Sequence, residues 1–127
     1  MARILIIDDD GPLRGALVEA LQLAGHEIFQ AEDGRQGVEV FKVAPCDLVV
    51  TDLIMPGQEG IETITQLLHE HPNLPIVAMS GSVAHSKLYL EMAQRLGARR
   101  TLAKPFSAAQ LLQAVDEALA PPTPPSK

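Results

Sequence analysis

The sequence has a single cysteine, no long apolar run and no surplus of basic residues, and each shortage excludes a class of protein. Cys46 has no partner for a disulfide within this chain, which is typical of a reducing compartment. No apolar stretch approaches the roughly 20 residues that a bilayer-spanning helix needs. The apolar run near the N-terminus is short and ends in aspartates, unlike a signal peptide. We therefore expect a cytoplasmic protein without a membrane span.

The formal net charge is −6, so the chain lacks the broad basic surface that binds nucleic acid. Neither G-x-G-x-x-G after the first apolar run nor a G-K-[ST] loop is present, which excludes dinucleotide and P-loop sites. A chain of 127 residues with 46% apolar content favours one packed domain, which we place at residues 1–120. Residues 121–127 read PPTPPSK and are predicted to form an extended tail or the start of a linker.

Short apolar runs alternate five times with helical patterns along the chain. The predicted strands are residues 2–7, 26–31, 47–51, 75–79 and 99–103, and helical periodicity follows each of them at 13–24, 34–43, 61–68, 84–96 and 107–119. Such alternation predicts an α/β protein with a five-stranded, doubly wound parallel sheet that has helices on both faces. The strand at 26–31 is short and is expected at an edge.

Polar side chains follow these strands at the edge of the sheet where ligands bind in such folds. Asp8 and Asp9 come after the first strand, Asp52 after the third, Ser80 after the fourth and Lys104 after the fifth. Each residue alone is unremarkable, because aspartates after strands are usually turn or cap residues, as Asp10 before Pro12 is expected to be. Their coincidence on successive strand ends predicts one site.

The clustered carboxylates predict a hard divalent cation. Two like charges about 4 Å apart repel by roughly 4 kcal/mol at an effective dielectric of 20, and a cation or a bound proton relieves this repulsion. Oxygen ligands suit Mg²⁺ or Mn²⁺. A carboxylate beside such an ion is able to accept a phosphoryl group, with Lys104 and the Ser80 hydroxyl contacting the phosphoryl oxygens. Gly81 leaves room for that group.

The motifs ILIIDDD, VVTDLIMPGQEG, MSGS and LAKPF together resemble the response-regulator receiver domain of two-component signalling, a CheY-like domain, over nearly all of residues 3–119. The resemblance implies a flavodoxin-like three-layer sandwich with strand order 2-1-3-4-5. It also implies a regulatory domain rather than a turnover enzyme. Its only chemistry would be its own Mg²⁺-dependent phosphorylation and dephosphorylation.

The same resemblance assigns roles to residues of this sequence. Asp52 would be the phospho-acceptor, supplied by a sensor histidine kinase or a phosphotransfer protein. Asp9, Asp52 and the Ile54 backbone carbonyl would bind Mg²⁺, with Asp8 acting through water. Ser80 and Lys104 would contact the phosphoryl group, and the Lys104–Pro105 bond would be cis.

The sequence departs from the family pattern in three segments. Thr101 stands where an aromatic residue usually couples to the hydroxyl at Ser80, which puts that coupling in question. Ile54 is apolar beside the phosphorylation site, which implies slow self-dephosphorylation. Arg99 and Arg100 replace a stretch that is commonly acidic.

The helix at 84–96 is apolar around more than one face. Leu88, Met92 and Leu96 are predicted to face the sheet, which leaves Tyr89, Leu90 and Ala93 on other sides. The resemblance places an output face on residues 84–119, so this helix is expected to contact an output domain or a second copy of the chain.

Two other functions compete with a phosphorylation switch. A fold-only interaction domain draws support from Thr101, although Asp9, Asp52 and Lys104 argue against it. A phosphatase with an aspartate nucleophile needs a second aspartate two positions on, where this chain has Ile54, and a cap domain for which there is no room.

Overall fold

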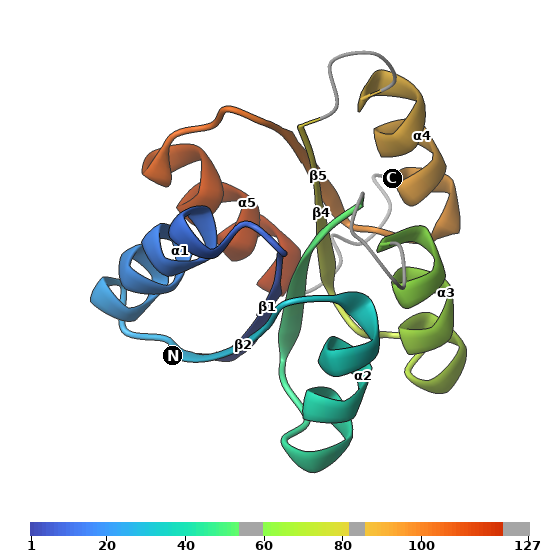
Figure 1. The fold of residues 1–127 in the computed structure, drawn as a ribbon, viewed down its shortest axis with the longest axis horizontal. Helices are drawn as coiled ribbons and strands as arrows, with labels where there is room; N and C mark the ends of the chain where they lie inside the picture. Colours follow the sequence, from blue (N-terminus) through green and yellow to red (C-terminus); the bar gives the residue numbers. More distant parts are fainter. Residues whose placement is uncertain (54–59, 82–85, 121–127) are drawn as a thin grey trace, which may run out of the picture.

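A computed structural model describes residues 1–53, 60–81 and 86–120, which form a parallel sheet covered by helices on both faces (Figure 1). The strands are β1 (Arg3–Ile7), β2 (Glu27–Ala31), β3 (Leu48–Asp52), β4 (Ile76–Ser80) and β5 (Arg100–Ala103). The helices are α1 (Gly11–Leu23), α2 (Gly34–Val43), α3 (Gly60–Glu70), α4 (Ser86–Leu96) and α5 (Ala108–Leu119). The predicted alternation of strands and helices is confirmed.

The strand order is β2-β1-β3-β4-β5, as the resemblance implied, and all four neighbouring pairs are parallel. β2 lies at one edge, as predicted. Because the strands are parallel, their carboxyl ends all meet at the same edge of the sheet, here called the carboxyl edge. The opposite end of the sheet is the amino edge.

The apolar strands supply two separate cores, one on each face. Helices α1 and α5 cover one face, where Ile4, Ile6, Val50 and Val77 pack, and α2, α3 and α4 cover the other (Figure 1). All five residues of β3 and of β4 are buried. Strands buried on both faces read as continuous apolar runs, which is why the sequence pattern identified them.

Local signals fix the ends of several helices. Asp10 and Asp33 are N-caps that accept the N–H of Leu13 and Gln36. Ser107 begins α5 with a capping box that includes Gln110, at the residue predicted. Gly25 and Gly97 have φ of +95° and +120°, a left-handed conformation that glycine adopts readily after a helix.

The predicted strand boundaries were one residue early at the two central strands. β3 ends at Asp52 and β4 at Ser80, because parallel pairing continues through Asp52 with Met79 and Ser80 with Ala103. Backbone bonds from Leu53 to Met79 and from Lys104 to Ser80 extend the ladder further. Asp52 and Ser80 are therefore strand residues with fixed backbones.

The predicted orientation of α4 is wrong. Ala93 is fully buried, and Tyr89 and Leu90 pack beside it against the core, whereas Leu88, Met92 and Leu96 are 55%, 39% and 40% exposed. The small Ala93 side chain allows close approach of the helix to the sheet. The C-terminal end of α4 is also held in place, because the N–H of buried Ala98 donates to the Ala93 carbonyl.

Cys46 is buried. Its burial, and to a smaller extent the nearby Asp47 charge, raise the pKa of its thiol to about 11. A buried thiol with a raised pKa is expected to be unreactive. Among the residues that the structure describes, none of the helices has the length and apolar character needed to cross a bilayer.

Candidate functional site

Asp8 is a buried, fully engaged carboxylate directly after β1. One oxygen accepts the backbone N–H of Asp10 at 3.0 Å, and the other accepts a hydrogen bond from the Lys104 ammonium at 2.9 Å. The Asp8 backbone N–H donates to the Ala31 carbonyl at 3.2 Å, which prolongs the β1–β2 pairing. The Asp8 charge is therefore held in one place.

Asp52 ends β3 and is 6% exposed. One of its oxygens accepts the N–H of Leu53 at 3.0 Å, and the other lies 3.5 Å from the Lys104 nitrogen. Burial raises the pKa of Asp52, the Lys104 charge lowers it and the Asp8 charge raises it again, for a net pKa of about 6. The carboxylate is thus ionised at neutral pH in an environment that disfavours its charge.

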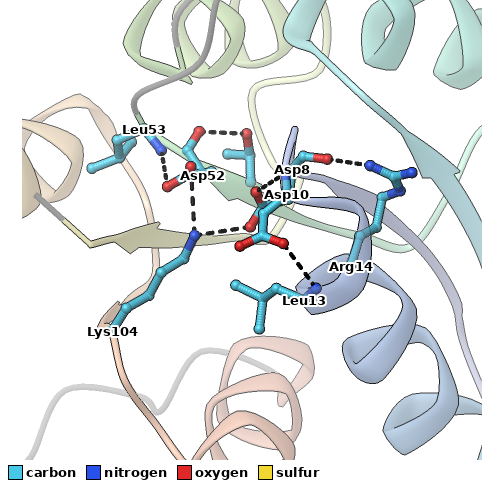
Figure 2. Close-up of polar contacts among 8 residues, drawn as sticks. Asp8, Asp10, Leu13, Arg14, Asp52, Leu53 and Lys104 are labelled. Carbon is cyan, nitrogen blue, oxygen red and sulfur yellow. Dashed lines mark hydrogen bonds and ion pairs between the residues drawn. The ribbon is translucent and has the colours of Figure 1, made fainter.

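Lys104 follows β5 and lies between the two aspartates, as Figure 2 shows. Burial lowers the pKa of Lys104, but its hydrogen bond to Asp8 and the charge of Asp52 outweigh burial, so the pKa is raised. The lysine is cationic at every physiological pH. The Lys104–Pro105 peptide bond is cis, as the resemblance implied.

Gly81 and Ser80 line the path of the lysine side chain. A Cβ at Gly81 would lie 3.0 Å from the Lys104 Cδ, tighter than ordinary contacts, so the missing side chain lets the lysine approach β4. The Ser80 hydroxyl is fully buried and has no hydrogen-bond partner in the described part of the chain. A buried hydroxyl without a partner is uncommon and fits a group that receives one from a ligand.

Asp9 completes a cluster of carboxylates. Oxygens of Asp8, Asp9 and Asp52 lie within 4.8 Å of one another. Asp9 is exposed, and within the described residues its carboxylate has no hydrogen bond or ion pair. Lys104 offsets part of the negative charge, and the remaining oxygen-only ligand set fits a hard divalent cation. The three carboxylates are therefore able to hold a metal ion.

Two of the residues discussed from the sequence fall elsewhere. Asp10 caps α1 through a 3.1 Å bond from Leu13 and is not part of the carboxylate cluster. Thr101 is half-buried on β5, opposite Ala78, so a small hydroxyl side chain occupies this position. Ile54 lies outside the described residues.

Two further residues that the sequence pattern did not indicate support the cluster. Arg14, in the first turn of α1, donates to the Asp8 backbone carbonyl at 2.6 Å (Figure 2). Gly60, the first residue of α3, lies so close to β3 that a Cβ there would overlap the backbone of Asp52 and Leu53. A glycine at the start of a helix after a breaker-rich loop was the available signal for Gly60. An arginine on a predicted helix gave none.

The amino edge presents a contrast. Arg99 and Arg100 both make side-chain contacts there. The Arg99 guanidinium donates to the carbonyls of Ala118 at 2.9 Å and Asn73 at 3.1 Å. Arg100 forms a 3.1 Å ion pair with Glu117. Arg99 therefore ties the last turn of α5 to the α3–β4 connection.

Residues 4–116 match the response regulator receiver domain family. The chain is 38% identical over 122 residues to the C4-dicarboxylate transport transcriptional regulatory protein DctD of Pseudomonas aeruginosa, covering 92% of this chain and 25% of that protein. It is 31% identical to the chemotaxis protein CheY of Thermotoga maritima, covering 91% of this chain and 95% of CheY.

Among solved structures, NtrX from Brucella abortus superposes with a TM-score of 0.87 at 29% identity, covering 93% of this chain and 26% of NtrX. CheY4 of Vibrio cholerae gives 0.84 at 28% identity, covering 94% of this chain and 99% of CheY4. The chain thus spans about a quarter of DctD and of the response regulator FleR of P. aeruginosa, but nearly all of the CheY proteins. On these matches and the fold, the chain belongs to the response regulator receiver domains of two-component signalling.

Proposed function

We propose that Asp52 is the phospho-acceptor of this receiver domain and that its phosphorylation switches the domain between two signalling states. The observation that carries the proposal is the sharing of one lysine by two buried carboxylates, at 2.9 Å from Asp8 and 3.5 Å from Asp52. Both carboxylates have contacts at both oxygens, but Asp52 lies farther from Lys104 than Asp8 does, and it ends the strand beside Ser80, whose hydroxyl has no partner within the described residues. Asp52 is therefore the better nucleophile of the two.

In the proposed reaction, an Asp52 oxygen bonds to the phosphorus of a phosphohistidine on a sensor kinase or phosphotransfer protein. The phosphorus–nitrogen bond breaks, and the imidazole leaves with the electron pair and takes up a proton. Lys104 exchanges part of its contact with Asp52 for the phosphoryl oxygens, and the Ser80 hydroxyl donates to them. Charge-assisted bonds of this kind favour the phosphorylated form.

Asp9 and Asp52, with the Ile54 backbone carbonyl, would hold Mg²⁺ or Mn²⁺, and Asp8 would contact the ion through water. When bound, the ion supplies positive charge that offsets repulsion between the carboxylates and the incoming phosphoryl group. Asp9 is suited to direct ligation because its carboxylate is exposed and lacks other partners within the described residues. Asp8 is suited to an indirect role because Lys104 and Asp10 already occupy its oxygens.

The test is intact-mass measurement after incubation with Mg²⁺ and acetyl phosphate. We expect the wild-type chain to gain one phosphoryl group, and Asp52→Asn or wild type with EDTA to gain none. Asp47→Asn, an aspartate at the amino edge, serves as the matched control and should still be phosphorylated. A wild-type chain that gains nothing would indicate a fold-only interaction domain, and repeated donor turnover would indicate a phosphatase. Either result contradicts the proposal.

The proposed partner surface is the face formed by α4, β5 and α5. Leu88, Met92 and Leu96 form an exposed apolar stripe along α4, spaced one turn apart. We propose that this stripe contacts a second copy of the chain or an output domain after phosphorylation.

Residues 1–120 would be the receiver unit and 121–127 a tail or linker. Cys46, a buried free thiol, supports a cytoplasmic location.

The stripe is tested by sedimentation of the beryllofluoride-treated protein. Met92→Glu should abolish self-association without lowering the free energy of unfolding, because Met92 is exposed. Leu90→Glu is the control, because Leu90 packs against the core and its substitution should destabilise the fold. If Met92→Glu self-associates as strongly as the wild type, the proposed role of the stripe is contradicted.

A further inference from the structure

Arg14 is the residue of α1 that reaches from the helix to the carboxyl edge. Its Nη1 donates to the Asp8 backbone carbonyl at 2.6 Å, and its Nε donates to the Gln30 side chain of β2 at 3.1 Å. Gln30 pairs with Ile6 in the β1–β2 ladder, so the guanidinium is anchored to the sheet as well as to the helix. Short hydrogen bonds from a charged donor are stronger than neutral ones.

The Asp8 carbonyl belongs to the peptide unit that precedes Asp9. Because a peptide unit is planar, fixing this carbonyl also fixes the direction of the Asp9 N–H and N–Cα bonds. The next peptide unit is held too, since the Asp10 N–H donates to the Asp8 carboxylate at 3.0 Å. Both peptide planes that flank Asp9 are therefore held by hydrogen bonds.

The Asp9 side chain contrasts with its backbone. Its carboxylate is exposed and, within the described residues, makes no hydrogen bond or ion pair, yet one of its oxygens lies within 4.8 Å of oxygens of Asp8 and Asp52. Among the residues that the structure describes, no side-chain contact holds this carboxylate close to the two like charges, which repel it. The two held peptide planes fix the direction in which the Asp9 side chain leaves the backbone.

We propose that Arg14 is a positioning residue for the metal site and raises cation affinity by holding the Asp8–Asp9 peptide unit so that the Asp9 carboxylate faces Asp52. The inference rests on the proposed metal-dependent function. It assigns the pre-organisation of the site to a side chain that does not touch the ion. Without Arg14, the peptide unit is free to rotate, and cation binding then carries the cost of ordering it.

If Arg14 acted only through its charge, its removal would change cation affinity in the opposite direction. A cationic side chain near the site repels a divalent ion, so loss of its charge alone would strengthen cation binding. Arg14 is only half-buried, and solvent screens this repulsion. Positioning should therefore outweigh repulsion. Supporting contacts behind metal ligands are typically worth about 10- to 100-fold in metal affinity.

The test measures Mg²⁺ affinity by isothermal titration calorimetry and Mn²⁺ affinity by the loss of the free-ion electron paramagnetic resonance signal, in the metal-free chain. We expect Arg14→Ala to weaken both affinities about tenfold. Arg14→Lys keeps the charge but loses the fork that reaches Asp8 and Gln30 together, and should also weaken them. Gln30→Ala removes the anchor and leaves the charge, so a smaller loss is expected.

The outcomes separate the explanations. Tighter binding in Arg14→Ala with unchanged binding in Arg14→Lys would show a charge effect and overturn the inference. A lower melting temperature with unchanged metal affinity would show a merely structural role and also overturn it. If Arg14→Ala does not fold, Arg14→Lys and Gln30→Ala decide the question by the same affinities. A wild-type chain that binds no cation would contradict the proposed function itself. A wild type and variants that bind the cation equally well would contradict only the role of Arg14.

Discussion

Both edges of the sheet carry charged side chains, but the contacts that these side chains make differ between the edges. At the amino edge, Arg99 donates to two carbonyls, and the Asp47 carboxylate accepts the Arg3 backbone N–H at 2.8 Å. At the carboxyl edge, two of the three clustered carboxylates share one lysine, and the Ser80 hydroxyl has no partner within the described residues. Polar groups at the amino edge stabilise the fold, whereas those at the carboxyl edge oppose one another. Functional sites are expected where such groups remain under-satisfied.

The largest expected effect concerns the close approach of α3 to the carboxyl edge. Gly60→Ala places a Cβ into the backbone of Asp52 and Leu53, which is unable to yield as a flexible side chain would. We expect a loss of about 3 kcal/mol in the free energy of unfolding by urea denaturation, at the upper end for overpacking.

Gly15→Ala is the matched control for this substitution. Gly15 lies on the exposed side of α1, and a Cβ there has no neighbour within 4 Å. The same chemical change should stabilise the chain by about 0.5–1 kcal/mol through helix propensity. Equal effects at the two glycines would contradict the tight contact.

The next effect tests the repulsion at the carboxyl edge. The folded pKa of Asp52 is about 6, above its value in the unfolded chain, so the folded state binds the proton more tightly. Its contribution to stability is present below about pH 4 and is lost as pH rises through about 6. Asp52→Asn should therefore raise the free energy of unfolding of the metal-free chain by about 2 kcal/mol at pH 7.5 and change it little at pH 4.

Asp47→Asn supplies the comparison at the amino edge, because Asp47 is exposed and accepts a backbone N–H. It should bring no gain in stability at either pH, as measured by the same urea titrations. Millimolar Mg²⁺ should stabilise the wild type and not Asp52→Asn. A gain in stability for both asparagine variants would remove the distinction between the two edges.

The smallest effect tests the amino edge itself. Arg99→Ala removes two charge-assisted bonds to carbonyls and should lower the free energy of unfolding by about 1.5 kcal/mol. Arg100→Ala removes an exposed ion pair with Glu117 and should lower it by about 0.5 kcal/mol or less. Both values should be independent of Mg²⁺ in thermal melts. A Mg²⁺-dependent loss in Arg99→Ala would mean that the two edges are coupled.

The fold was predictable because its signals are local. Continuous apolar strands, Gly25 and Gly97 after helices, and Ser107 at an N-cap each identify an element without knowledge of its neighbours. The carboxyl-edge residues followed from the same logic, since parallel strands bring their ends together. The sequence did not place the ends of β3 and β4, because pairing with a neighbour decides where a strand stops.

The orientation of α4 and the role of Arg14 were not predictable for a related reason. On α4, two apolar stripes share the helical period, and the choice between them depends on close packing at Ala93. Arg14 acts through a backbone carbonyl, an acceptor that every residue possesses and that no sequence motif marks. Contacts of this kind become visible only when the chain is folded.

The buried thiol of Cys46 has a practical consequence for following this domain in solution. Since it is the chain's only cysteine and its pKa is raised to about 11, maleimide reagents at neutral pH should leave it unmodified in the native state. A cysteine introduced at an exposed position such as Leu88 would then take a spin label or fluorophore alone. The natural background therefore needs no cysteine removal before spectroscopy.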